Sequence, residues 1–178
     1  MIKLISEIFR NKSGKIIMPL FIFGLIGLCI EIIYRAFYGS MVGFYEDLSY
    51  MSLMGYTSVW MVTVYGFGGM ALSVINEVPK YYNLKMIWQM LIGGFALIVI
   101  ELIFGVIFNI CLGLYLWDYS DKFMNLWGQI CLFNSVLWVI ATPFFIFVCD
   151  YVGWALYREN EAWHYRVYDN YIDIFKGI

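Results

Sequence analysis

Two carboxylates occur where a membrane-spanning segment normally excludes charge. Glu31 interrupts the late part of one long apolar run, and Glu101 lies in the middle of another. An unpaired charge at the centre of a bilayer costs at least about 2.5–3.5 kcal/mol, so such residues are rare and usually face a polar interior. Inside a helical bundle these two side chains could take up a proton, or hold a cation or a polar solute.

The two acids differ in their nearest partners along the chain. Arg35 follows Glu31 by four residues, which is one helical turn on the same face, so this pair can neutralise itself. Glu101 has no such neighbour, and Gly94 and Asn109 make its predicted helical face small and polar. A purely structural Glu101 would be neutral and hydrogen-bonded to another helix. We predict that Glu31, Arg35, Glu101 and Asn109 form a polar centre for transport.

A second polar group of residues lies between positions 117 and 129. It comprises Trp117, Asp118, Tyr119, Ser120, Asn125 and Gln129. We predict that this group is an outer loop in which Asp118, Tyr119, Ser120 and Asn125 form the mouth of a solute path. The alternative is structural: the aromatic residues, with Trp127, suit an interfacial belt, and Asp118 or Ser120 suits the N-cap of a short helix.

A third candidate combines hydroxyl groups with glycines. Tyr65, Gly66 and Gly68 lie in an uncharged run that also carries several Ser, Thr and Tyr residues. Glycines in a spanning helix permit either a break or close packing, and hydroxyls can bond across helices. The segment is therefore predicted to be a hinge or a packing point. The glycines do not form a nucleotide-binding fingerprint, because no strand precedes them.

Composition determines the class of protein that must position these residues. The chain has 178 residues, of which 63% are hydrophobic and 13% charged, with a mean hydropathy of +0.77. Soluble domains are about 45–50% apolar and roughly 25% charged, so a soluble protein is excluded. A disordered chain is excluded for the same reason. The net charge of −2 gives no basic field for nucleic acid.

Four apolar runs are each long enough to cross a bilayer, which takes about 20 residues. They are residues 16–37, 50–76, 84–116 and 123–149. Since the runs are continuously apolar and do not alternate, they predict helices and not a barrel. The third is longer than one crossing requires, so we expect a tilt, a protruding end, or a kink near Gly105 or Gly113.

The predicted fold is therefore an all-α, four-helix transmembrane bundle. Residues 1–15 form a cytoplasmic N-terminal segment, residues 16–157 form the transmembrane domain, and residues 158–178 form a cytoplasmic amphipathic tail helix. Nine of the eleven basic residues fall on one side of this arrangement and only Arg35 and Lys122 on the other. The positive-inside rule then places both termini of this multi-pass protein of the cell membrane in the cytoplasm.

No cofactor or metal site is expected from the sequence. The cysteines are Cys29, Cys111, Cys131 and Cys149, and no pair has the short spacing of a zinc or redox motif. The chain also lacks a Walker A sequence, so we do not expect it to hydrolyse ATP by that route.

Taken in order, these residues resemble a known family. The series that carries the resemblance runs Glu31, Tyr65-Gly66-Phe67-Gly68, Glu101, Trp117-Asp118-Tyr119-Ser120, Asn125, Gly128, Ile130-Cys131-Leu132, Ser135 and Trp138. It is similar to the putative ABC-transporter type IV family, also called CmpB-like, which consists of small bacterial multi-span membrane proteins. The likeness extends from about Gly24 to Val152. The chain departs from the family pattern at Gln129, where a basic residue is usual.

The resemblance implies a transport-linked membrane subunit. We expect a permease component that moves an unknown polar or cationic solute, surrounded by lipid and assembled with itself or with partner membrane or ATPase subunits. Two other classes remain open. One is an integral membrane enzyme that uses Glu101 or Asp118 as an acid or base, and the other is a scaffold or sensor that transports nothing.

Overall fold

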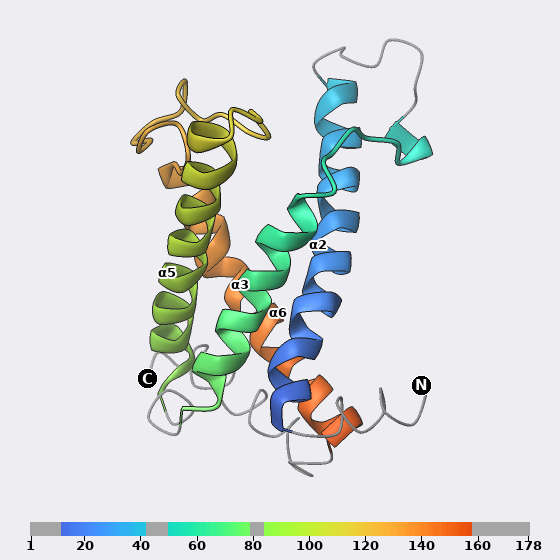
Figure 1. The fold of residues 1–178 in the computed structure, drawn as a ribbon, viewed down its shortest axis with the longest axis vertical. Coiled ribbons are helices and arrows are strands. Elements are labelled where there is room, and N and C mark those ends of the chain that lie inside the picture. Colours follow the sequence, from blue (N-terminus) through green and yellow to red (C-terminus); the bar gives the residue numbers. More distant parts are fainter. Residues whose placement is uncertain (1–11, 42–49, 79–83, 158–178) are drawn as a thin grey trace.

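The computed structural model describes residues 12–41, 50–78 and 84–157, and the regular elements in this part of the chain are helices (Figure 1). Its elements in chain order are α2 (Lys12–Met41), the 3-10 turn η1 (Tyr50–Ser52), α3 (Met61–Asn76), α5 (Met86–Gly105), the π-helix η2 (Val106–Cys111) and α6 (Leu132–Tyr157). The all-α prediction is confirmed. The predicted tail helix at 158–178 and the N-terminal segment up to residue 11 lie outside the described residues.

Three of the helical segments are long and apolar enough to cross a membrane, so the chain is a multi-pass membrane protein. They are Ile17–Phe37, Met86–Cys111 and Leu132–Ala155. The helix α3 is also apolar but has only 16 residues. It is about 24 Å long, which is shorter than the roughly 30 Å hydrocarbon core of a bilayer. Three of the four predicted spans are confirmed, and the second run contains a shorter helix.

Two of the predicted runs begin well before the helices that they contain. The second run becomes a regular helix at Met61 and not at residue 50, and the fourth begins at Leu132 and not at residue 123. Apolar composition extends beyond these helices, but the backbone leaves helical geometry. Leu53 (φ 51°) and Gly128 (φ 70°) adopt left-handed conformations in the two segments that precede the helices. Such conformations interrupt a right-handed helix.

The third run also changes geometry where glycines stand. The α-helix gives way to the π-helix directly after Gly105, close to one of the two predicted kink positions. The helical segment ends at Cys111, before the predicted end of the run at residue 116. Gly113 follows with a φ angle of 64°. A glycine in this left-handed conformation is the usual way in which a helix terminates.

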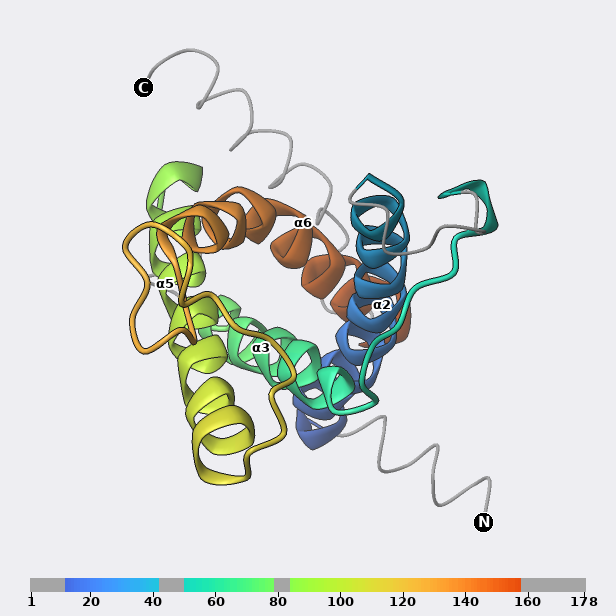
Figure 2. The ribbon, with the colours of Figure 1, turned by 90° about the horizontal axis from the view of Figure 1, so that it is seen from above.

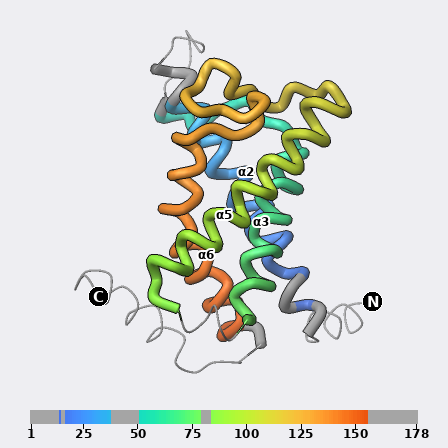
Figure 3. The backbone as a smooth tube through the Cα atoms, turned by 90° about the vertical axis from the view of Figure 1, so that its left-hand side faces the viewer, coloured from blue at the N-terminus to red at the C-terminus, as the bar shows by residue number. Residues whose placement is uncertain are grey.

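Glycines bring α2 and α3 into close contact. A Cβ atom on Gly66 would lie 2.5 Å from the carbonyl oxygen of Leu20, and one on Gly24 would lie 2.8 Å from that of Val62. Because small residues let helix backbones approach closely, they favour tight packing inside a membrane. Seen from above, α3 and α6 lie on opposite sides of the bundle, between α2 and α5 (Figure 2). In the side view α5 is inclined across α3 (Figure 3).

Residues 112–131 cover one end of the bundle, which we call the loop end (Figures 1 and 3). Arg35 lies at this end, because its guanidinium donates to the carbonyl oxygen of Leu116. Lys85 precedes α5 at the opposite end. The basic residues at these two positions are thus separated as the sequence predicted, and which end faces the cytoplasm stays a prediction.

Candidate functional site

The first polar contact set surrounds Glu31 on α2. Nε of Arg35 lies 2.7 Å from Oε1 of Glu31, so the ion pair predicted from the four-residue spacing is present. The hydroxyl of Tyr65 on α3 donates to Oε2 of Glu31 at 2.7 Å. Both carboxylate oxygens therefore have a close donor, and the charge is compensated by a cation on the same helix.

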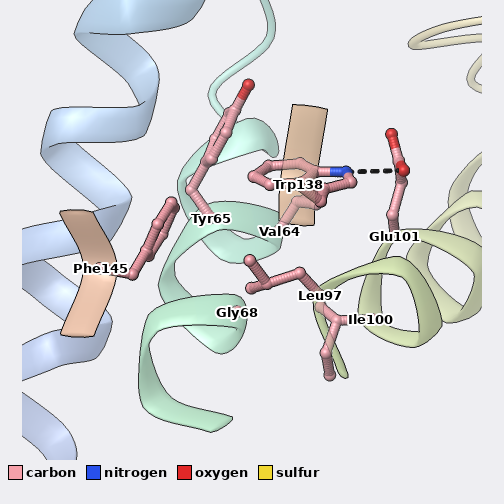
Figure 4. A pocket seen from close by; sticks show the side chains of 8 residues that line it. All are labelled: Val64, Tyr65, Gly68, Leu97, Ile100, Glu101, Trp138 and Phe145. Atoms are coloured by element: carbon pink, nitrogen blue, oxygen red, sulfur yellow. Dashed lines mark hydrogen bonds between the residues drawn. The ribbon is translucent and has the colours of Figure 1, made fainter. Parts of the chain in front are cut away.

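The second set surrounds Glu101 on α5, which is only 5% exposed. Nε1 of Trp138 on α6 donates to Oε2 of Glu101 at 2.8 Å (Figure 4). The hydroxyl of Tyr119 lies 3.3 Å from Oε1 and donates to it. Within the described ranges, no lysine or arginine comes within salt-bridge distance of Glu101. Neutral donors alone hold this carboxyl group.

A small cavity lies beside Glu101 in the bundle interior (Figure 4). Its lining residues are Val64, Tyr65, Gly68, Leu97, Ile100, Glu101, Trp138 and Phe145. The volume is about 10 Å³, which is room for roughly one water molecule. Glu31 is not among the lining residues. The two acids are connected through Tyr65 and Trp138, whose rings lie 5.8 Å apart.

Tyr119 reaches Glu101 from the loop end. Its backbone N–H donates to the carbonyl oxygen of Gly128 at 2.8 Å, which fixes this part of the loop. Burial, followed by the negative charges of Glu101 and Glu31, raises the pKa of Tyr119 well above its ordinary value. The phenol therefore keeps its proton over the physiological pH range and remains available as a donor to Glu101.

Asn109 contacts the loop and not the two acids. Its Nδ2 donates to the carbonyl oxygen of Trp117 at 3.0 Å and to Oε1 of Gln129 at 2.8 Å. Its Oδ1 accepts from the backbone N–H of Leu116 at 2.6 Å. Asn109 and Gln129 are both buried. The structure thus brings together Asn109 from the predicted polar centre and Gln129 from the predicted outer loop, and their contact attaches the loop to η2.

The rest of the predicted mouth forms turns within the loop. The two carboxylate oxygens of Asp118 accept from the backbone N–H and the hydroxyl of Ser120, at 2.9 and 3.0 Å. Nδ2 of Asn125 donates to the carbonyl oxygens of Ser120 and Lys122. The bond from the backbone N–H of Ser120 to Asp118, two residues earlier, makes an Asx-type turn. The alternative that Asp118 or Ser120 caps a short helix before the fourth span is wrong, because residues 113–131 contain no helix.

The aromatic residues of the loop divide into two kinds. Trp117 is half-buried, and its Nε1 donates to the carbonyl oxygen of Gln129 at 2.9 Å. Tyr119 is also half-buried and points to Glu101. Trp127, by contrast, is 68% exposed. Of the three residues proposed for an interfacial belt, only Trp127 is free to serve in one.

The glycine segment of α3 is a packing point in this conformation. The helix runs unbroken from Met61 to Asn76, through Tyr65, Gly66 and Gly68. A Cβ atom on Gly68 would lie 3.0 Å from a methyl carbon of Leu97, while Gly66 packs against α2. These glycines let α3 approach helices on both of its sides.

Sequence reasoning did not identify Trp138 as a site residue. A signal was available: an indole N–H in an uncharged, membrane-spanning run needs a hydrogen-bond acceptor. In a membrane-spanning segment few side chains could supply a hydrogen-bond acceptor, and the carboxylate of Glu101 was the strongest candidate for this acceptor.

Comparison with known proteins places most of this chain in one group. A family model described as putative ABC-transporter type IV matches residues 18–168. No curated protein and no solved structure gives a significant match.

Proposed function

Because the chain belongs to the putative ABC-transporter type IV family, we propose that it is a small permease-type subunit that moves a polar or cationic solute across the cell membrane. The observation that carries this proposal is Glu101. It is a buried carboxylate on a spanning helix, held by neutral donors and beside a cavity. A buried intramembrane acid of this kind is costly to keep and commonly marks an ion or substrate path.

The proposed polar centre has two parts with different roles. Glu101 is the group that meets the solute or its coupling ion. Glu31, neutralised by Arg35, accepts the hydrogen bond of Tyr65, which lines the cavity and whose ring contacts that of Trp138. Asp118, Tyr119, Ser120 and Asn125 form the mouth at the loop end, which the predicted orientation places outside the cell.

The described conformation is the closed one in this proposal. A cavity of about 10 Å³ holds roughly one water molecule and no organic solute. Opening therefore requires the loop to move away from the bundle or the helices to separate. Four helices barely enclose a path, which favours assembly with further copies of the chain or with partner membrane and ATPase subunits.

The test is solute flux in proteoliposomes that contain the purified chain and a panel of labelled cations and small polar solutes. Glu101→Gln keeps the shape of the side chain and removes its charge, and we expect it to abolish flux. Asp121→Asn is the matched control, because Asp121 is an exposed carboxylate of the same loop end, and we expect it to keep full flux.

Two results would contradict the proposal. One is a wild-type chain that moves none of the solutes, and the other is flux that survives Glu101→Gln. Turnover of a lipid or solute in detergent, without a gradient, would indicate a membrane enzyme instead.

A further inference from the structure

We propose that Glu101 is a proton-binding site that is reached from the loop end through the hydroxyl of Tyr119. The idea that this proton drives solute movement rests on the proposed transport function. The idea that Glu101 binds a proton rests only on the contacts of Glu101.

The size and lining of the cavity select the proton over other cations. Apart from Glu101 and Tyr65, the lining side chains of the cavity carry no oxygen. Metal cations such as Ca²⁺ need about 6–8 oxygen ligands, and Mg²⁺ needs near-ideal octahedral geometry. Within the described part of the chain there is no group of three or more His, Cys, Asp or Glu that could hold a metal ion. A proton needs a single oxygen atom, which Glu101 supplies.

The charges around Glu101 favour the same assignment. On α2, Glu31 interacts with Glu101 electrostatically, and its own charge is compensated by Arg35. The other titratable groups nearby are Tyr65 from α3 and Tyr119 and Cys131 from the loop side. No cation compensates Glu101 itself among the described residues. An uncompensated carboxylate in a low-dielectric interior is unfavourable, and proton binding removes that charge.

The two hydrogen bonds determine which oxygen takes the proton. The indole N–H of Trp138 can only donate, so it stays bound to Oε2 in either charge state. The hydroxyl of Tyr119 can donate or accept, so it can reverse its bond when Oε1 becomes an O–H group. The proton therefore binds at Oε1, on the side that faces Tyr119.

Tyr119 also provides the route to that oxygen. Its neighbours Asp118 and Ser120 are exposed at the loop end, while its own hydroxyl contacts the buried carboxylate. In the transfer, the Tyr119 hydroxyl hydrogen moves to Oε1 of Glu101 as the phenolic oxygen takes a proton from a hydronium ion at the loop end, which is left as a neutral water molecule. The tyrosine is unchanged at the end of the step, and Glu101 has gained one proton.

The experiment is infrared difference spectroscopy on the full chain in lipid nanodiscs after a rapid drop in pH, with no solute added. The wild type should gain a carboxylic-acid carbonyl band as the pH falls. Glu101→Gln should lose this band, and Asp121→Asn, which removes an exposed carboxylate outside the polar centre, is the matched control that should keep it. Glu101→Asp should keep a band at a shifted frequency, which decides the assignment if the glutamine variant does not fold.

Tyr119→Phe tests the route separately. It should keep the band but slow its appearance several-fold, because the relaying hydroxyl is gone. A full band in Glu101→Gln, or an unshifted band in Glu101→Asp, would overturn the proton site. An unchanged rate in Tyr119→Phe would overturn the route. Because no solute is present, an intact band together with absent flux would contradict the proposed function and leave proton binding in place.

Discussion

Glu31 and Glu101 are both largely shielded, and each accepts a hydrogen bond from a tyrosine, yet they are stabilised in opposite ways. Glu31 is paired with Arg35 at 2.7 Å, and its side chain is 13% exposed. Glu101 has the indole of Trp138 in place of a cation, and a cavity beside it. A carboxylate paired to a cation is held in its charged form, whereas one held by neutral donors can change its protonation state at lower cost. Under the proposed function, Glu31 is therefore the acid that positions Tyr65, and Glu101 is the acid that binds the proton.

The largest expected effect comes from removing the cation of the first acid. Arg35→Met leaves Glu31 uncompensated and should lower the free energy of unfolding by about 3 kcal/mol, at the low end for a buried pair because Arg35 is partly exposed. Adding Glu31→Gln should restore most of the loss, since the stranded charge is removed. Thermal unfolding in detergent measures both.

The matched control for that change is Lys122→Met, which breaks the exposed ion pair with Asp121. The side chains of Lys122 and Asp121 are 51% and 71% exposed, so solvent screens their attraction. Stability should stay within experimental error. If the two variants lose equal stability, the distinction between a shielded and an exposed pair fails.

A smaller effect is expected when the second acid loses its indole donor. Trp138→Phe keeps an aromatic ring and removes the N–H that binds Glu101, a hydrogen bond worth about 1.5–3 kcal/mol when the acceptor is charged. The loss should be larger at high pH, where Glu101 is a carboxylate, and smaller at low pH, where it has taken up a proton. Chemical unfolding at two pH values measures the difference, and an equal penalty at both would show that Glu101 does not change its charge.

The smallest effects come from the two tyrosine hydroxyls. Tyr65→Phe should cost about 1.5 kcal/mol, the lower limit for a hydrogen bond to a charged acceptor, and Tyr119→Phe about 1 kcal/mol or less. Tyr65 should cost more, because its hydrogen bond to Glu31 is 2.7 Å long while that of Tyr119 to Glu101 is 3.3 Å. Parallel unfolding curves of the two variants give the ranking. A greater loss in Tyr119→Phe would mean that the contact with Glu101 is the tighter one.

Much of the fold could be predicted from local properties of the chain. Long apolar runs without charge need no tertiary information to be recognised as spanning helices. The Glu31–Arg35 pair was equally accessible, because a spacing of four residues brings two side chains together on any α-helix. The ends of the helices could not be predicted from such local properties. Apolar composition continues past Cys111 and begins before Leu132, while Gly113 and Gly128 take the chain out of helical geometry.

The candidate site was predicted in part, since its acids were identified but their partners were not. Asn109 shares a predicted helical face with Glu101, yet it hydrogen-bonds to Gln129, twenty residues away, at the loop end. Tyr119 was assigned to a mouth or an aromatic belt, and it lies against Glu101. These contacts join residues from different elements, so their formation depends on how the loop folds over the bundle.

The sequence by itself determined the membrane class, the main helical runs and the presence of two interior acids, because the cost of burying charge is set by residue type and position along a helix. Tertiary structure decided which partners each acid has. Only the packing of α6 against α5 brings Trp138 to Glu101, and only the loop brings Tyr119 to it. Hydrogen bonds act over a few ångströms, so the partners of a buried carboxylate depend on which helices and loops meet around it.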